Sequence, residues 1–205
     1  MKKIIHFAML FLIHFSVLGQ EKFTKDLDFD GIIDSVYVNT DESRIICKLS
    51  SQNFKEIKSK PIEILNEMSG IIDSKNGFTF FNDWMRAGYK NQFRYNKKTK
   101  KIQLIGMSRY EFGNAANDGS GESSVNLLTN DYIGNWKVYD HLANDENGEL
   151  IKLPTTKTKM KFRIINLGDF GEETYFNFSD KCSTLYYKEK KRYLIQNGHG
   201  YLKEN

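Results

Sequence analysis

Residues 91–110 read NQFRYNKKTKKIQLIGMSRY, and this stretch decides the fold class. Two runs that mix apolar and polar residues, Asn91 to Tyr95 and Lys101 to Met107, flank a polar segment that begins at Asn96. Runs of this composition are typical of β-strands, and a short polar connection between two of them predicts an antiparallel hairpin. The stretch therefore indicates an antiparallel β protein.

The same pattern recurs along the chain. A second hairpin is predicted at Ser74 to Gly77, because Asn76-Gly77 is a strong turn signal. The predicted strands are Ile33–Asn39, Arg44–Leu49, Ile62–Leu65, Gly70–Asp73, Gly77–Asn82, Asn91–Tyr95, Lys101–Arg109, Ser123–Leu128 and Asn135–Tyr139.

Two segments do not have the period of a strand. Residues 155–162 carry polar side chains around Met160, and Ser179 is a suitable cap for a short helix that continues to Tyr193. We therefore predict a mainly β fold, a single antiparallel β-sheet or sandwich-like domain with a short C-terminal helix.

The two ends of the chain differ from its middle. Lys2 and Lys3 precede an apolar run from Ile4 to Leu18, which is the order of a secretory signal peptide. The run is shorter than the roughly 20 residues of a membrane span, so we predict no span and a signal peptide over residues 1–19. The β-rich domain is expected over 20–193 and a loosely ordered tail over 194–205, and the location is expected to be periplasmic or secreted.

The charge of the mature chain is close to balanced. Removing Lys2 and Lys3 from 30 basic residues leaves 28 against 26 acidic residues, a net charge of +2. A nucleic-acid-binding protein needs a dominant basic face, and so does a protein whose main partner is an anionic membrane. This balance argues against both classes of partner.

Cys47 and Cys182 are the two thiols of the chain. In an oxidising compartment an isolated pair in one domain can be bridged. The alternative is that they are small buried hydrophobic residues, since Cys47 lies in an apolar run. The sequence leaves both interpretations open.

Residues 26–34, DLDFDGIID, are the most chemically specific stretch. Four carboxylates within nine residues repel one another without a cation, and glycine in sixth place permits the sharp turn of a calcium loop. The twelfth place holds Tyr37 where an EF-hand has glutamate, and a strand follows instead of a helix. The alternative is a solvated acidic turn. The predicted ligands of a structural calcium ion are Asp26, Asp28, Asp30, the carbonyl of Ile32, and Asp34.

The sequence contains few candidate catalytic residues. His141 and His199 are the histidines that remain after export, and no carboxylate or cysteine lies at metal-ligand spacing from either. A glycosidase needs two convergent acids, and its candidates are Asp83, Glu111, Asp118 and Glu122. We therefore expect a protein that is not an enzyme, and we keep a glycosidase as the least favoured alternative.

A long polar connection lies between two predicted strands. Residues 110–122 read YEFGNAANDGSGE, which is longer than a minimal hairpin loop. Such a tip can enter the cleft of another protein, and the alternative is an ordinary flexible connection. The candidate partner-binding residues are Arg109, Tyr110, Phe112, Asn117, Asp118, Ser120 and Glu122.

Several motifs together resemble a family of periplasmic lysozyme-inhibitor-like immunity proteins. They are the signal peptide, Asp28 to Asp34 leading into Val36-Tyr-Val38, Phe93-Arg-Tyr95, Leu104-Ile-Gly106, and Ser123 to Thr129. The resemblance spans residues 26–139 and implies a β-rich fold, calcium at the acidic turn, and loops that block the cleft of a peptidoglycan-cleaving enzyme. It implies residues 113–122 as the blocking loop, whereas the chain after Tyr139 departs from the family pattern.

The functional expectation is therefore a non-enzymatic inhibitor of a lysozyme-like muramidase. The alternative is a structural or carbohydrate-binding module of the cell envelope, in which Trp84, Tyr89 and Trp136 stack on sugar rings. Large aromatic residues are mostly buried, so we expect these three to pack in the core.

Overall fold

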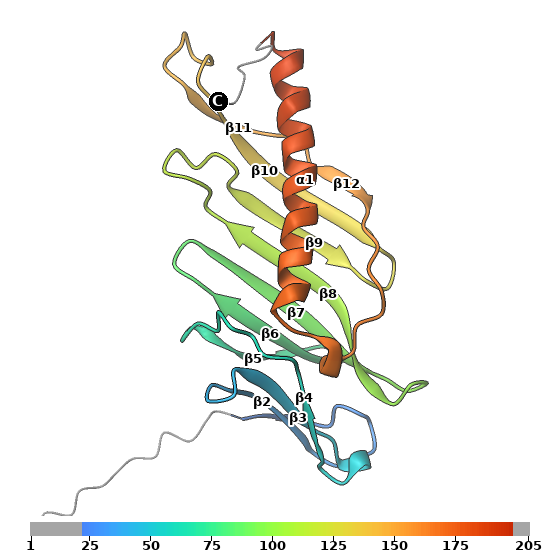
Figure 1. Cartoon of the computed structure of the whole chain (residues 1–205). Coiled ribbons are helices and arrows are strands. Elements are labelled where there is room, and N and C mark those ends of the chain that lie inside the picture. The colour runs from blue at the N-terminus through green and yellow to red at the C-terminus, as the bar shows by residue number, and fades with distance from the viewer. Residues whose placement is uncertain (1–21, 199–205) are drawn as a thin grey trace, which may run out of the picture.

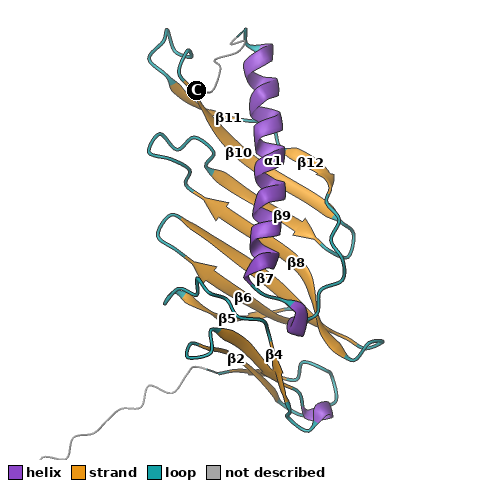
Figure 2. Cartoon of the chain, in the orientation of Figure 1, coloured by secondary structure: helices purple, strands orange, loops and turns teal. Residues whose placement is uncertain are grey.

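The structure is a computed structural model that describes residues 22–198. It consists of two antiparallel β-sheets and a long helix, α1, which lies across one face of the larger sheet (Figure 1). Figure 2 shows that strands dominate the described chain and that the smaller sheet lies at one end of the larger one. The predicted fold class, mainly antiparallel β with a C-terminal helix, is confirmed.

The smaller sheet has four strands in sequence order. They are β1 (Phe23–Lys25), β2 (Asp34–Asn39), β3 (Arg44–Lys48) and β4 (Glu56–Lys58). Buried β-branched residues of β2 and β3, among them Val36 and Ile45, join the same core as the larger sheet. An ion pair of 2.7 Å between Lys25 of β1 and Asp73 also links the two sheets.

The larger sheet is a meander of hairpins. Its strands are β5 (Ser69–Ser74), β6 (Gly77–Asp83), β7 (Ala87–Asn96), β8 (Lys101–Glu111), β9 (Gly121–Asn126), β10 (Asp131–Asp140), β11 (Glu149–Lys152) and β12 (Thr156–Lys159). One edge of β10 pairs with β9, and the other edge pairs with β12 near Asp131 and with β11 near Lys137. The hairpin predicted at Asn96 joins β7 to β8.

Helix α1 spans Glu172–Gln196 and covers the inner face of the larger sheet (Figure 1). Its buried residues Tyr175, Phe178, Cys182 and Tyr186 recur every three or four positions, so they form one stripe that faces the sheet. The ring of Tyr175 stacks on that of Tyr89, with a centroid distance of 4.2 Å. The opposite face of the sheet, which we call the outer face, has no helix over it within residues 22–198 (Figure 1).

Several sequence predictions differ from the structure. The helix is longer than predicted and begins at Glu172, where Gly171 occupies the N-cap without a side-chain hydrogen bond. Residues 155–162, predicted to lack a strand, contain β12, whereas the strand predicted at 62–65 is absent from that segment. Of the predicted tail, residues 194–196 continue the helix and residues 197–198 form a turn, while residues 199–205 lie outside the described residues. The predicted signal peptide, residues 1–19, also lies outside them.

Candidate functional site

The acidic loop between β1 and β2 curls around the side chain of Asp26. The Oδ1 atom of Asp26 accepts hydrogen bonds from the amides of Phe29 (2.7 Å) and Asp30 (3.2 Å). Its Oδ2 atom accepts one from the amide of Gly31 at 3.0 Å. Phe29 and Gly31 have φ angles of 67° and 87°, which glycine adopts freely and phenylalanine does not. These four residues therefore hold a tight turn of the kind that wraps a cation.

Three of the predicted ligands converge. Asp26, Asp28 and Asp34 each place a carboxylate oxygen within 4.8 Å of the others. Asp34 is fixed in position because Oδ2 accepts the amide of Leu27 at 2.7 Å and Oδ1 accepts the amide of Ser50 at 2.7 Å.

The side chain of Asp28 is buried and only partly hydrogen-bonded. It is 7% exposed, and its Oδ1 atom is buried without a hydrogen-bond partner among the described residues. A buried carboxylate oxygen without a donor is costly, and a bound cation removes that cost. A set of hard oxygen atoms suits calcium, so Asp26, Asp28 and Asp34 fit the predicted metal.

Asp30 is not part of this convergent group. Its Oδ2 atom accepts the hydroxyl of Ser50 at 2.7 Å, and its Oδ1 atom accepts the amide of Ile32 at 2.9 Å. The hydrogen bond from Ser50, followed by that from Ile32, lowers the pKa of the Asp30 carboxyl. Asp30 therefore lies outside the convergent group of Asp26, Asp28 and Asp34, and both of its carboxylate oxygens are bound by Ser50 and Ile32.

Two serines that the sequence analysis did not single out clamp the loop. Ser50 and Ser51 lie in a short 3-10 helix, η1 (Ser50–Gln52), directly after β3. The hydroxyl of Ser51 donates to Oδ2 of Asp28 at 2.5 Å, so that only Oδ1 of that carboxylate is left open within the described chain. These serines are 20 and 23 residues from their aspartates, and no local sequence pattern signals the pairing.

The two cysteines are not bridged. Both thiols are free and buried, Cys47 on β3 and Cys182 on α1, so the bridged interpretation is wrong. Burial, with the nearby charges of Asp34 and Asp28, raises the pKa of the Cys47 thiol. The Cys182 thiol accepts a hydrogen bond from the Ser123 hydroxyl at 3.2 Å, and burial raises its pKa too. Both behave as small core residues.

The connection between β8 and β9 does not project as a free tip, contrary to expectation. Asp118 is bound by Lys190 Nζ (2.8 Å), by the Tyr186 hydroxyl (3.0 Å) and by the Tyr139 amide (2.8 Å). Ser120 is 8% exposed. Residues 118–120 therefore pack against β10 and α1, whereas Asn114, Ala115 and Asn117 are exposed.

Arg109 is also buried and is wrong as a surface anchor. It is 5% exposed, forms an ion pair with Glu111, and lies 5.6 Å from the centroid of the Trp136 ring. Its position on the inner face follows from the alternation of β8, which places Tyr110 on the outer face. Arg109 borders a hollow of the larger sheet but exposes little of its side chain to a partner.

Phe112, by contrast, is exposed and braced. It is 48% exposed, and its ring lies 5.8 Å from that of Tyr110. The guanidinium of Arg86, from the β6–β7 turn, lies 5.8 Å from the Phe112 ring centroid and donates to the carbonyls of Phe112, Gly113 and Asn114 at 3.3–3.4 Å. Met85 beside it is 88% exposed. We call Met85, Arg86 and Phe112 the braced tip.

A shallow groove of about 290 Å³ lies on the outer face of the larger sheet. One row across the strands contains Gly88, Tyr110, Glu122 and Asn135, which are paired in register from β7 to β10. Small residues, Ser108 and Ser124, line the hollow beside this row. Tyr110 and Glu122 of the predicted partner-binding set therefore share one surface, whereas Asn117 lies exposed in the connecting loop.

The four candidate acids of a glycosidase do not gather. Asp83 and Glu122 belong to the same cross-strand row but lie three strands apart, which is roughly 14 Å at the usual strand spacing. A glycosidase pair is about 5 to 9.5 Å apart. Glu111 pairs with Arg109, and Asp118 is held by Lys190. This arrangement gives no support to the glycosidase alternative.

The aromatic residues considered for sugar stacking pack inside. Tyr89 and Trp136 are each 2% exposed, and Trp84 is partly buried against the core. The expectation of core packing is confirmed for these three. Tyr110 and Tyr89 both line the outer groove, and Tyr110 is the more exposed of the two. Burial, and then the charge of Asp83, raises the pKa of the Tyr110 hydroxyl.

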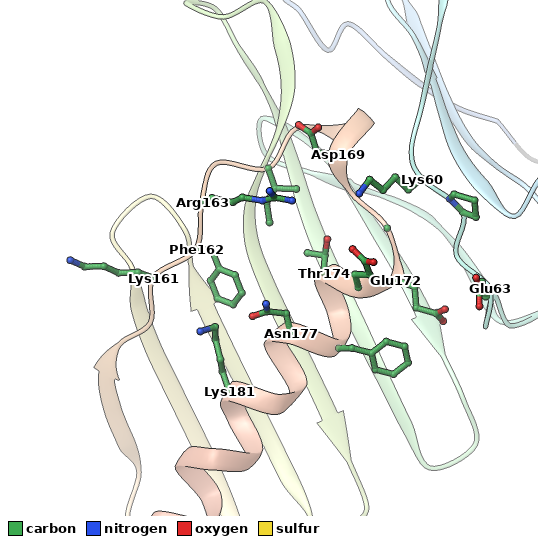
Figure 3. A pocket seen from close by; sticks show the side chains of 15 residues that line it. Lys60, Glu63, Lys161, Phe162, Arg163, Asp169, Glu172, Thr174, Asn177 and Lys181 are labelled. Carbon is green, nitrogen blue, oxygen red and sulfur yellow. The ribbon is translucent and has the colours of Figure 1, made fainter.

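The larger cavity, of about 720 Å³, lies beside the first turns of α1 (Figure 3). Its walls carry cationic side chains such as Arg163 and Lys181 and anionic ones such as Glu63 and Glu172 (Figure 3). Glu172 accepts the amide of Ile64 at 2.9 Å, and Lys181 lies 5.6 Å from the centroid of the Phe162 ring. Opposite charges are mixed along the wall, so the cavity does not favour one sign of ligand.

The chain was compared with protein families, curated proteins and solved structures, and none of them matches it. Within residues 22–198, no helix is both long and apolar enough to cross a lipid bilayer.

Proposed function

We propose that this protein is an exported, calcium-binding, non-enzymatic protein that inhibits a lysozyme-like muramidase. The observation that carries the proposal is the braced tip, in which Arg86 holds the exposed Phe112 and the neighbouring Met85 is exposed. Rigid aromatic and arginine side chains are the types that dominate protein interfaces. A muramidase cleft contains catalytic carboxylates, so the cation of Arg86 complements its charge.

The motif resemblance to lysozyme-inhibitor-like immunity proteins supports the same function. In this proposal the blocking element is the braced tip instead of residues 113–122, because Asp118 is bound by Lys190 and Ser120 is buried. Calcium has a structural role in this proposal. Its ligands Asp26, Asp28 and Asp34 lie in the first loop of the described chain and would fix β1 and β2 relative to β3.

Inhibition of cell-wall lysis tests the proposal. The protein is mixed with a broad panel of muramidases, and lysis of peptidoglycan is followed by turbidity. We expect slower lysis with at least one enzyme, and weaker inhibition by Phe112→Ala and by Arg86→Glu. Phe176→Ala is the matched control, because Phe176 is 46% exposed on α1 and lies outside the braced tip. Unchanged lysis across the panel would remove the inhibitor function.

The outer groove favours a second candidate, a carbohydrate-binding module of the cell envelope. Tyr110 offers an aromatic ring, while Glu122, Asn135 and Ser124 offer hydrogen-bonding groups along the same surface. Sedimentation with insoluble peptidoglycan separates the two functions. A carbohydrate-binding module pellets with the polymer and loses this property in Tyr110→Ala, whereas a pure inhibitor stays in the supernatant.

A further inference from the structure

Large hydrophobic side chains are exposed around the acidic loop. Phe29, Ile32 and Ile33 within the loop are 47%, 54% and 59% exposed, and Phe54 after η1 is 49% exposed. The hydrogen bonds from Ser50 and Ser51 to Asp30 and Asp28 hold η1 against the loop. We call Phe29, Ile32, Ile33 and Phe54 the apolar rim. Exposed hydrophobic residues gathered near one site indicate a contact with another surface.

A basic turn lies against the same loop. The β7–β8 hairpin carries Lys97, Lys98, Lys100 and Lys101, all exposed. The Nζ atom of Lys97 lies 4.8 Å from the centroid of the Phe29 ring, and Gln52 donates to the carbonyl of Lys100 at 3.1 Å. Figure 1 shows the tip of this hairpin on the same side of the molecule as η1.

The lysines near the rim have no acidic partner in the described chain. Lys97, Lys98, Lys100, Lys101 and Lys55, which follows Phe54, form no ion pair within residues 22–198. Five lysines against the four aspartates of residues 26–34 give a local charge of +1, and a bound calcium ion raises it to +3. The metal would therefore turn a nearly neutral patch into a positive one.

We propose that the calcium-loaded protein docks this patch on an anionic phospholipid surface. The apolar rim enters the boundary between headgroups and acyl chains, and the lysines pair with lipid phosphates. The apolar rim with lysines beside it complements a lipid surface, in which phosphates lie above a hydrocarbon layer. The inference rests on the proposed calcium site. The net charge of the whole chain does not reveal this positive patch, because the chain is close to neutral and these five lysines lie together near the acidic loop.

Vesicle sedimentation of the full mature chain tests the proposal. The vesicles contain phosphatidylcholine alone or an equimolar mixture with phosphatidylglycerol, in calcium or in chelator. We expect sedimentation with the anionic vesicles in calcium and its loss in chelator or on phosphatidylcholine. Each lysine lost should weaken binding about fivefold, the equivalent of ~1 kcal/mol, so Lys97→Glu with Lys98→Glu should abolish most of it. Phe29→Ser with Phe54→Ser should abolish binding as well.

Matched controls and a second readout separate the outcomes. Ile164→Ser is the apolar control, and the pair Lys152→Glu with Lys157→Glu is the charge control. All three residues are exposed and lie outside the patch, so these variants should sediment like the parent. Thermal melting of each sample reports calcium binding independently of lipid. A melting shift without sedimentation overturns the docking inference and leaves the calcium site standing. If calcium causes neither a melting shift nor sedimentation, both the calcium site and the docking inference are wrong. Sedimentation that persists in chelator overturns the role of calcium in docking.

Discussion

The hydroxyl of Ser51 donates a hydrogen bond of 2.5 Å to Oδ2 of Asp28, whose Oδ1 atom is buried without a partner in the described chain. One residue of η1 thus sets the orientation of a carboxylate in a loop that β2 and β3 separate from it in the sequence. Asp28 also places a carboxylate oxygen within 4.8 Å of carboxylate oxygens of Asp26 and Asp34. This arrangement makes Ser51 a positioning residue for the proposed cation.

Ser51→Ala should therefore weaken calcium binding about tenfold or more, the usual loss when a partner of a metal ligand is removed. Isothermal titration calorimetry with calcium measures the change. Ser183→Ala on α1, outside the acidic loop, is the control and should bind calcium as the parent does. Equal affinities of the Ser51 variant and the parent would show that Asp28 needs no such support.

Asp118 predicts a specific pH dependence of stability. Burial opposes its ionisation, but Lys190, the Tyr139 amide and the Tyr186 hydroxyl outweigh this and lower the pKa below its ordinary value of 3.8. A lowered folded-state pKa gives stabilisation that is present above the ordinary value and is lost as the pH falls through the folded-state value. Asp118→Asn should cost about 1–3 kcal/mol at neutral pH, and its deficit should shrink below about pH 4.

Urea unfolding of the parent and Asp118→Asn across this pH range measures that dependence. Asp41→Asn, at an exposed carboxylate in the turn between β2 and β3, is the comparison variant. A deficit of Asp118→Asn that stays constant down to acidic pH contradicts the assignment of the effect to its charge.

The stripe of α1 that faces the sheet predicts unequal effects at neighbouring positions. Phe178 is 1% exposed and Phe176 is 46% exposed. Phe178→Ala should lower the free energy of unfolding by about 3–5 kcal/mol, while Phe176→Ala should change it by no more than about 0.5 kcal/mol. Chemical denaturation of both variants measures this, and similar losses at the two positions would contradict the packing of the helix.

The thiols should be inaccessible and unbridged. Cys47 and Cys182 are each 0% exposed and free. A thiol-specific chromogenic reagent should react with neither residue in the native protein and with both after unfolding without reductant. If no thiol appears on unfolding, the cysteines are bridged and the geometry around Ser123 and Cys182 is wrong.

The sequence predicts the longer strands of both sheets, but it misses the short strands β1, β4, β11 and β12. The hairpin at Asn96 is found because both of its strands carry core residues, such as Phe93 and Leu104. Strand β12 is missed because Thr156–Lys159 is entirely polar and depends on pairing with β10. The helix start is missed because Gly171 is a weak cap, although Tyr175 and Phe178 already show helical spacing.

The candidate site is only partly local in sequence. Asp26, Asp28 and Asp34 lie within nine residues, so their convergence could be predicted. The contributions of Ser50 and Ser51 arise from the packing of η1 on the loop, which no short pattern records. The length and polar composition of residues 113–122 predict a projecting loop. They do not reveal the contacts of Asp118 with Tyr186 and Lys190, which are distant in sequence.

Thermal melting with calcium and with chelator tests the central claim, that the acidic loop holds a divalent cation, most directly. At a calcium concentration a hundredfold above the dissociation constant, binding should stabilise the fold by about 2.7 kcal/mol and raise Tm by roughly 5–10 °C. Asp28→Asn should abolish the shift, and Asp73→Asn, outside the loop, should retain it. A midpoint that is the same in calcium and in chelator would contradict the account.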